Sequence, residues 1–192
     1  KSFANLNKLT SLKLNGCEEL QSIEYLSNLV NLTSLDLSEC NSLQTVDGLA
    51  NLVNLTSLDL SECNSLQNVD GLANLANLTS LDLRSCSSIA HPSKEVMTNR
   101  EEVIEYQDKI RFVKALINGD GDVLSEYKKI TSLDLSFCKS LWNVDGLAKL
   151  TNLTSLNLHY CSSLQSVDGL ANLTNLTSLD LSQCDSLQNV DG

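Results

Sequence analysis

Residues 31–53 read NLTSLDLSECNSLQTVDGLANLV, and residues 54–76 repeat this stretch with changes only at Thr45/Asn68 and Val53/Ala76. Cysteines mark the same period of 23 residues along the chain, apart from one longer gap between Cys86 and Cys138. They are Cys17, Cys40, Cys63, Cys86, Cys138, Cys161 and Cys184. The 192-residue chain is therefore one short unit copied seven times, with a single interruption.

Each copy, called a rung below, carries two local signals. Counting Leu32 as position one, Ser34–Ser38 alternates polar and apolar residues, which predicts a strand with one buried face. Asp47-Gly48 predicts a helix cap and a turn, and Leu49–Leu52 predicts a short 3₁₀ or helical turn. One rung is too small to fold alone, so stacked neighbours must supply the rest of the core.

The pattern L-x-x-L-x-L-x-x-C-x-x-L resembles the leucine-rich repeat, and the three-residue spacing of Val46, Leu49, Leu52 and Leu55 is similar to bacterial internalin-like repeats. The resemblance implies an α/β fold, a right-handed solenoid with a concave parallel β-sheet and short 3₁₀ or helical turns on its convex side. We expect a single solenoid of about seven repeats over residues 1–192. Cysteine stands where many such repeats have asparagine, so we expect a buried ladder of thiols that donate to backbone carbonyls where each strand turns.

A helical insertion over residues 90–129 interrupts the repeats. Thr98–Glu101 has the pattern of a capping box, and Val103, Tyr106, Ile110 and Val113 form an apolar stripe at helical spacing. The main helix is expected at about 99–118, followed by a shorter helical segment over 123–129. The insertion is expected to be a helical hairpin along the outer curve or edge, with a docking element as the alternative.

The charge and composition of the chain exclude some classes of partner. A formal charge of −11 and a pI near 4.5 argue against nucleic acid and against an anionic membrane, since both require a basic surface. No apolar run is long enough for membrane insertion. Buried free thiols favour a reducing compartment such as the cytoplasm, whereas a bacterial surface is the alternative location if a signal has been removed.

No enzyme, cofactor or metal signature is found. Only His91 and His159 are present, neither has a nucleophile at a recognisable spacing, and CxxC pairs are absent. Position five carries Asp in most rungs and predicts an acidic ladder on the sheet, either a solvated face or a place for a bridging cation. Asn118–Asp122 resembles the start of a calcium loop but lacks the later glutamate.

The candidate partner-binding surface lies where the strand-end residues differ between rungs. Positions seven and eight are small or acidic in the second and third rungs but become basic or aromatic from the fourth to the sixth. Large rings and directional donors are typical of interaction hot spots. The alternative is that Phe137 and Tyr160 only pack on each other or support the insertion. The candidates are Asp82, Arg84, Asp134, Phe137, Lys139, Trp142, His159 and Tyr160.

The resemblance and these residues together predict a non-enzymatic binding module that recognises a protein or a glycan on its concave face, as part of a larger protein. The alternative is a structural element that stacks end to end through the apolar ends of the solenoid, around Phe3, Leu6, Leu187 and Val190. The identity of the partner does not follow from these residues.

Overall fold

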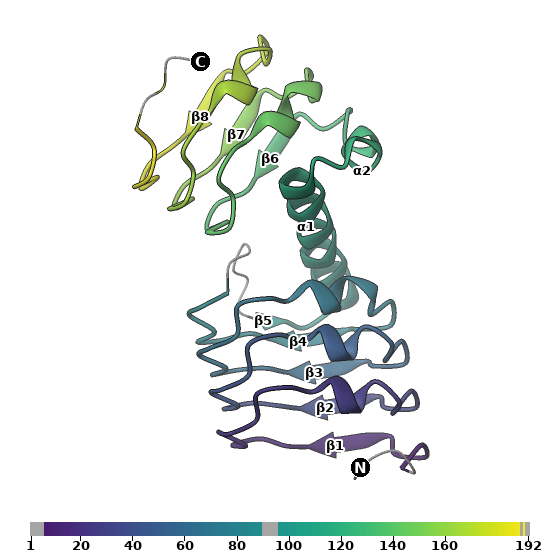
Figure 1. The fold of residues 1–192 in the computed structure, drawn as a ribbon. Coiled ribbons are helices and arrows are strands. Elements are labelled where there is room, and N and C mark those ends of the chain that lie inside the picture. Colours follow the sequence, from purple (N-terminus) through teal and green to yellow (C-terminus); the bar gives the residue numbers. More distant parts are fainter. Residues whose placement is uncertain (1–5, 90–95, 189, 191–192) are drawn as a thin grey trace. The chain divides into compact units, whose positions relative to one another are not determined.

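The computed structural model describes residues 6–89, 96–188 and 190, and it divides the chain into two compact units. The first unit comprises Lys1–Ile89 with Ser93–Ile110, and the second comprises Ala90–Pro92 with Arg111–Gly192. Within each unit the repeats follow one another as successive coils (Figure 1). Phe3 and His91, which the sequence analysis considered, lie outside the described residues.

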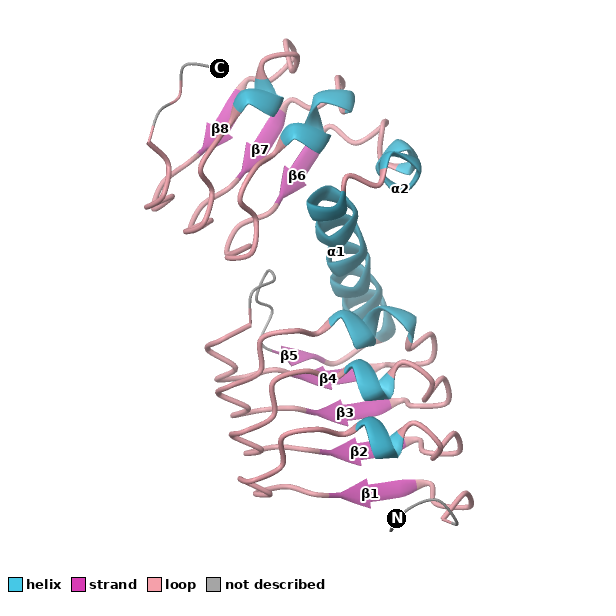
Figure 2. Cartoon of the chain, in the orientation of Figure 1, coloured by secondary structure: helices cyan, strands magenta, loops and turns pink. Residues whose placement is uncertain are grey.

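The first unit contains a five-stranded sheet whose strand order follows the chain. Its strands are β1 (Ser11–Lys13), β2 (Ser34–Asp36), β3 (Ser57–Asp59), β4 (Ser80–Asp82) and β5 (Val96–Met97). Strands β1 to β4 are parallel, and each residue pairs with its counterpart in the next rung, as Leu35 does with Leu58. Strand β5 runs antiparallel to β4. Three 3₁₀ helices lie across the coils from the strands (Figure 2): η1 (Glu24–Leu26), η2 (Asp47–Leu49) and η3 (Asp70–Asn74).

The second unit repeats this arrangement with three parallel strands. They are β6 (Ser132–Asp134), β7 (Ser155–Asn157) and β8 (Ser178–Asp180), and they pair in the same register, with Leu156 opposite Leu179. The 3₁₀ helices are η4 (Asp145–Lys149) and η5 (Asp168–Leu170). Parallel strands, 3₁₀ turns and a helical insertion confirm the predicted solenoid class.

Leucines at equivalent positions fill the interior of both units. Leu35, Leu58 and Leu81 at position four are all buried in the first unit, and Leu156 is buried in the second. Leu179, which occupies the same position in β8, is 43% exposed because no described strand covers its outer side. Burial of a leucine side chain stabilises the folded state by about 1.5 to 3 kcal/mol, so each rung depends on a neighbour on both sides.

The helix α1 (Arg100–Asn118) begins one residue later than the capping box predicts. The Asn99 side-chain oxygen accepts from the Glu102 backbone N–H at 3.0 Å, and the Glu102 carboxylate accepts from the Thr98 backbone N–H at 3.0 Å. Asn99 is therefore the N-cap, and Glu102 rather than Glu101 reaches back, to the N–H of the residue before the cap. The prediction that Thr98 is the cap was wrong by one residue, because both Thr and Asn can fill that role.

The first half of α1 belongs to the core of the first unit. Val103, Tyr106 and Ile110 are buried among the leucines of its last rungs. Gln107 is 8% exposed, and its side-chain N–H groups donate to the carbonyl oxygens of Leu72 at 2.7 Å and of Leu75 at 3.0 Å. These contacts make this half of α1 a cap on the first solenoid, since it buries apolar side chains and satisfies backbone acceptors there.

The second half of α1 and the helix α2 (Gly121–Glu126) belong to the core of the second unit. Phe112 packs edge-to-face on Tyr127, with ring centroids 4.8 Å apart and planes at 78°. Leu116 and Leu124 lie next to η4, so close that a Cβ added at Gly146 would be 2.6 and 2.9 Å from their methyl carbons. The insertion thus supplies core residues to both units. No helix among residues 6–89 and 96–188 is long and apolar enough to cross a membrane.

The seven rungs form two sheets rather than one in this structure, since β4 pairs with β5 and not with a strand of the following repeat. Four rungs lie in the first unit and three in the second. A single continuous solenoid over residues 1–192 stays a prediction.

Most of the cysteines form the predicted ladder. Cys40, Cys63, Cys138, Cys161 and Cys184 are buried, and all seven are free thiols. The Cys63 thiol donates to the Leu37 carbonyl of the preceding rung at 3.2 Å, and Cys161 makes the equivalent bond to Leu135 at 3.2 Å. The prediction that all seven cysteines are buried was wrong, however. Cys17 is exposed and Cys86 is half-buried.

The glycine of the recurrent Val-Asp-Gly sequence has a different role from the predicted turn. Gly48, Gly71 and Gly169 do not have positive φ angles. A Cβ added at Gly71 would lie 2.3 Å from the Val46 carbonyl oxygen of the preceding rung, and one at Gly169 would lie 2.2 Å from that of Val144. Glycine is required because two backbones approach too closely for any side chain to fit between them.

Candidate functional site

The aspartates of the predicted acidic ladder end the strands. In the first unit the Asp59 carboxylate accepts from the Ser61 backbone N–H at 2.9 Å and from its hydroxyl at 2.6 Å. In the second unit Asp134 accepts from the Ser136 N–H, and the Asn157 side-chain oxygen accepts from the His159 N–H, both at 2.9 Å. This Asx-turn turns the chain after each strand. This role was not predicted, although the recurrent Asp-Leu-Ser sequence carries the signal for it.

The residue after this turn adopts a left-handed backbone conformation in every described rung. The residues are Gly16, Glu39, Glu62, Ser85, Phe137, Tyr160 and Gln183, with φ between 59° and 70°. Glycine adopts this conformation without strain, whereas it is unusual for bulky side chains. Two rungs of the second unit nevertheless carry Phe137 and Tyr160 at this position, and both side chains point away from the core, with exposures of 39% and 41%.

Three of the predicted residues form one contact group, called the aromatic cluster: Phe137, His159 and Tyr160. The Phe137 and Tyr160 rings are stacked, with centroids 5.3 Å apart and planes at 11°. The His159 ring stands nearly perpendicular to both, 5.5 Å from Phe137 and 5.0 Å from Tyr160. Stacked and edge-to-face pairs at these distances are favourable, so the cluster is a preorganised surface.

The orientation of His159 is fixed from the next rung. Its Nδ1 lies 2.7 Å from the Ser182 hydroxyl, which in turn donates a short hydrogen bond to the Asp180 carboxylate. Hydrogen bonds from the Ser182 side chain and backbone are the main cause that holds the pKa of Asp180 below its usual value. Ser182 was not among the predicted residues, although it lies 23 positions after His159 and therefore beside it.

The other five predicted residues are not members of the three ring pairs that define the cluster. Trp142 is 52% exposed. Asp134 and Lys139 belong to the second unit. Asp82 and Arg84 belong to the first unit, where they form an ion pair at 2.6 Å. Burial raises the pKa of Asp82, but the hydrogen bonds and charge of Arg84 outweigh this and lower it overall.

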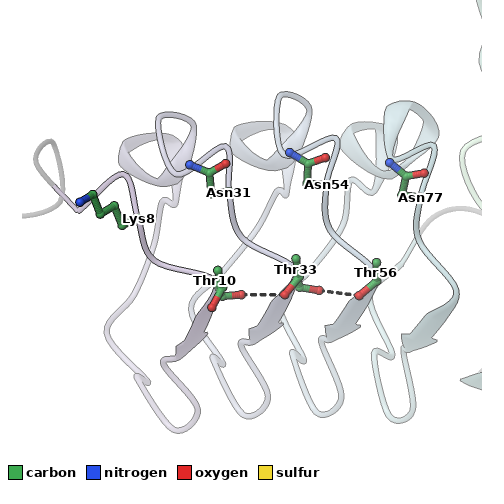
Figure 3. Close-up of a pocket in the computed structure, with 7 residues that line it drawn as sticks. All are labelled: Lys8, Thr10, Asn31, Thr33, Asn54, Thr56 and Asn77. Atoms are coloured by element: carbon green, nitrogen blue, oxygen red, sulfur yellow. Dashed lines mark hydrogen bonds between the residues drawn. The ribbon is translucent and has the colours of Figure 1, made fainter.

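The first unit also carries a shallow groove lined by Lys, Asn and Thr side chains, which was not predicted from the sequence. Its cavity volume is about 640 Å³, and two columns line it (Figure 3): Lys8, Asn31, Asn54 and Asn77 on one side, and Thr10, Thr33 and Thr56 on the other. The Asn54 side chain donates to the Val30 carbonyl at 2.9 Å, and the Thr56 hydroxyl donates to the Thr33 carbonyl at 2.9 Å. These side chains tie each rung to the preceding one, which explains their recurrence structurally.

The described residues offer little for covalent or metal chemistry. Burial raises the pKa of the Cys63 and Cys161 thiols to about 12, so these sulfurs are protonated and inaccessible at neutral pH. Across residues 6–89, 96–188 and 190, no group of three or more His, Cys, Asp or Glu side chains is placed to hold a metal ion.

Two family models match this chain. A model described as the BspA type leucine-rich repeat region, with six copies, matches residues 1–94, and a model of Zer-1-like leucine-rich repeats matches residues 121–190. A search of curated proteins gave no match.

Solved structures that resemble the chain include an internalin C2 from Listeria monocytogenes, with 24% identity and a TM-score of 0.38 over 91% of this chain and 71% of that one. An internalin (InlF) from the same organism has 21% identity and a TM-score of 0.34 over 99% and 63%. A leucine-rich repeat protein from Leptospira interrogans has 16% identity and a TM-score of 0.31 over 93% and 50%. The chain thus spans half to about seven tenths of the length of these proteins.

Proposed function

This chain belongs to the leucine-rich repeat superfamily, and from that premise we propose that it is a non-enzymatic binding module whose second unit contacts a protein partner at the aromatic cluster. Proteins built from leucine-rich repeats are commonly protein-binding modules that use their concave surface. A glycan is the alternative partner.

The exposed, stacked rings of Phe137 and Tyr160 are the observation that carries this proposal. Both residues occupy a left-handed backbone position that the chain elsewhere fills with Gly, Ser, Gln or Glu. A large ring in that conformation costs stability locally, of the order of 1 kcal/mol, and such strain clusters at functional sites. Aromatic side chains with a rigid, solvent-facing surface are also the commonest hot spots of protein interfaces.

The surface beside the cluster is suitable for a partner to approach. Position three of every rung is serine, so Ser132, Ser155 and Ser178 present small side chains along the second sheet. Phe137, His159 and Tyr160 follow β6 and β7 by only two or three residues, and the Phe137 and Tyr160 rings are exposed. A partner segment lying along the sheet would therefore reach the rings without a steric obstacle from the strand residues.

Replacing Phe137 by Ser and Tyr160 by Gln is expected to weaken partner binding strongly without unfolding the chain. These replacements are taken from the chain itself, because Ser85 and Gln183 hold the same backbone conformation in other rungs. Peptides selected from a random display library on the wild-type chain should bind the double variant at least about tenfold more weakly, as loss of two hot-spot rings requires. Affinity can be measured by surface plasmon resonance.

Glu62→Ser provides the matched control, since Glu62 holds the equivalent position in the first unit. This variant should bind the selected peptides as the wild-type chain does. Selected peptides that bind the double variant as tightly as the wild-type chain would place the binding surface elsewhere and refute the proposal.

A second candidate function, end-to-end assembly, is favoured by the exposed edge of β8. Leu179 is 43% exposed there, whereas its counterpart Leu156 in β7 is 1% exposed. Within the first unit, Lys13 of β1 pairs with Asp36 of β2. If β1 of a second copy paired with β8 in the same register, Lys13 would lie opposite Asp180, so that two opposite charges would face each other.

Charge exchange tests this assembly by sedimentation velocity over a concentration series. The wild-type chain should associate, and Lys13→Asp should weaken association about fivefold, since like charges would then face each other across the strands. Adding Asp180→Lys should restore association, and the presence of Lys13 at position five of β1 indicates that lysine is tolerated there. A wild-type chain that stays monomeric at all concentrations removes this candidate.

A further inference from the structure

We infer that the group recognised by the aromatic cluster is an arginine side chain of the partner. This inference rests on the proposed function and names the chemistry of its contact. Three properties of the surface lead to it: the exposed rings, the hydrogen-bonding state of His159, and the sign of the charge around the cluster.

The rings offer a face for a planar cation. Phe137 and Tyr160 are stacked at 5.3 Å and remain about two-fifths exposed, so part of their π surface meets solvent. A cation above an aromatic face is attracted by the ring quadrupole, and arginine is used more often than lysine because its guanidinium also stacks. The same surface would accept an aliphatic or sugar face, so the rings alone do not select the ligand.

His159 adds an acceptor beside the rings. The Ser182 hydroxyl has one hydrogen, which it donates to Asp180, so its oxygen must accept from the His159 Nδ1–H. Neutral His159 therefore carries its proton on Nδ1 and leaves the lone pair of Nε2 available. Nε2 makes no hydrogen bond to any residue that the structure describes. A ligand that binds here therefore gains a hydrogen bond if it donates, and arginine has five N–H donors and no acceptor.

The charges near the cluster also favour a cation. Positions five to ten of the three rungs in the second unit carry three carboxylates, Asp134, Asp180 and Asp185, against one ammonium group, Lys139. The whole chain has a formal charge of −11, so its long-range field attracts basic partners and repels acidic ones. Acceptors, negative charge and aromatic faces together match a guanidinium better than a neutral sugar or a carboxylate.

The test uses the 192-residue chain and the peptide acetyl-Gly-Ser-Arg-Ser-Gly-amide, compared with the same peptide carrying citrulline, which is neutral but has nearly the same shape. Aromatic proton NMR reports the contact directly. The chain has only three Phe and four Tyr residues, so the Phe137 and Tyr160 signals can be assigned by substitution. The arginine peptide should shift these signals with an affinity about fivefold higher than the citrulline peptide, as loss of a cation–π contact predicts.

Variants at Asp134 and His159 test the contributions of the negative charge and of the hydrogen-bond acceptor separately. Asp134→Asn removes a charge but keeps the strand-ending turn, because Asn157 already makes the equivalent hydrogen bond in the next rung. It should reduce the preference for arginine over citrulline. His159→Gln, which keeps an acceptor, should retain more of the binding than His159→Lys, which supplies a fixed positive charge.

Equal responses to the arginine and citrulline peptides would overturn the inference, and so would ring shifts caused by cellohexaose but by neither peptide. Either result would leave the proposed function standing if display-selected ligands still depend on Phe137 and Tyr160. Conversely, arginine-selective shifts of the rings support the inference by a measurement that does not use those selected ligands.

Discussion

Replacing Gly71 by alanine is expected to destabilise the first unit by about 3 kcal/mol, at the upper end of what overpacking costs. The added Cβ would lie 2.3 Å from the Val46 carbonyl oxygen and 2.8 Å from its carbonyl carbon. Both atoms belong to the backbone of the preceding rung, so they cannot move aside without shifting the rung and its leucines. The expected result is a lower urea midpoint for the transition of the first unit.

Gly146→Ala is the control for this prediction, because Gly146 holds the same sequence position but follows the insertion. Its added Cβ would come closest to the side-chain methyl carbons of Leu116 at 2.6 Å and Leu124 at 2.9 Å, whereas the nearest backbone atom, the Leu116 Cα, lies 3.9 Å away. Flexible side chains can rotate, so we expect a cost of about 1 kcal/mol. Equal costs for the two substitutions would contradict the close approach of successive rungs.

In the native chain, the cysteines should differ by orders of magnitude in the rate at which they are alkylated. Cys17 is exposed and should react with iodoacetamide at the rate of a free thiol. Burial raises the pKa of Cys63 and Cys161 to about 12, so only about one in ten thousand of these thiols is ionised at pH 8. Enclosure in the core slows their reaction further. Cys86, half-buried with a pKa raised by burial to about 11, should be intermediate.

Mass spectrometry of peptides after timed alkylation measures these rates. Cys17→Ser should remove the fast phase and leave the others unchanged. After denaturation in urea, all seven cysteines should react at similar rates, because the pKa shifts and the enclosure depend on folding. Uniform labelling of the native chain, or recovery of disulfide-linked peptides, would refute the thiol ladder.

The period of the sequence predicted most of the fold because one geometric rule, the return of each residue after 23 positions, governs every rung. This rule gave the leucine columns and the pairing of Leu35 with Leu58. The end of α1 at Asn118 also agrees with the sequence, since Asn118-Gly119 breaks the helical pattern.

The rule fails where a rung lacks a neighbour. Cys17 carries the repeat signature but is exposed, because the other thiols pack on the carbonyl of a preceding rung and no described rung precedes Cys17. The pairing of β4 with β5 was not predictable from repeat spacing, since residues 96–97 lie within the insertion. Likewise, the need for glycine at Gly71 comes from a contact with Val46 in another rung, which local turn preferences do not report.

For the candidate site, comparison of equivalent positions selected Phe137, His159 and Tyr160 correctly as a group of neighbours. Adjacent rungs bring such residues together, so their contact follows from the period. The same reasoning would have found Ser182, which stands at the position of His159 one rung later. Arg84 belongs to the first unit and the aromatic cluster to the second, so their grouping in one binding surface stays a prediction.

The most direct test of the proposed binding surface is an NMR footprint of a display-selected peptide on the wild-type chain. Backbone and ring signals are recorded with and without the peptide. The account predicts that the largest changes fall on Phe137, His159 and Tyr160 and on the strand residues of β6 to β8. Changes confined to residues of the first unit, with these three side chains unaffected, would contradict it.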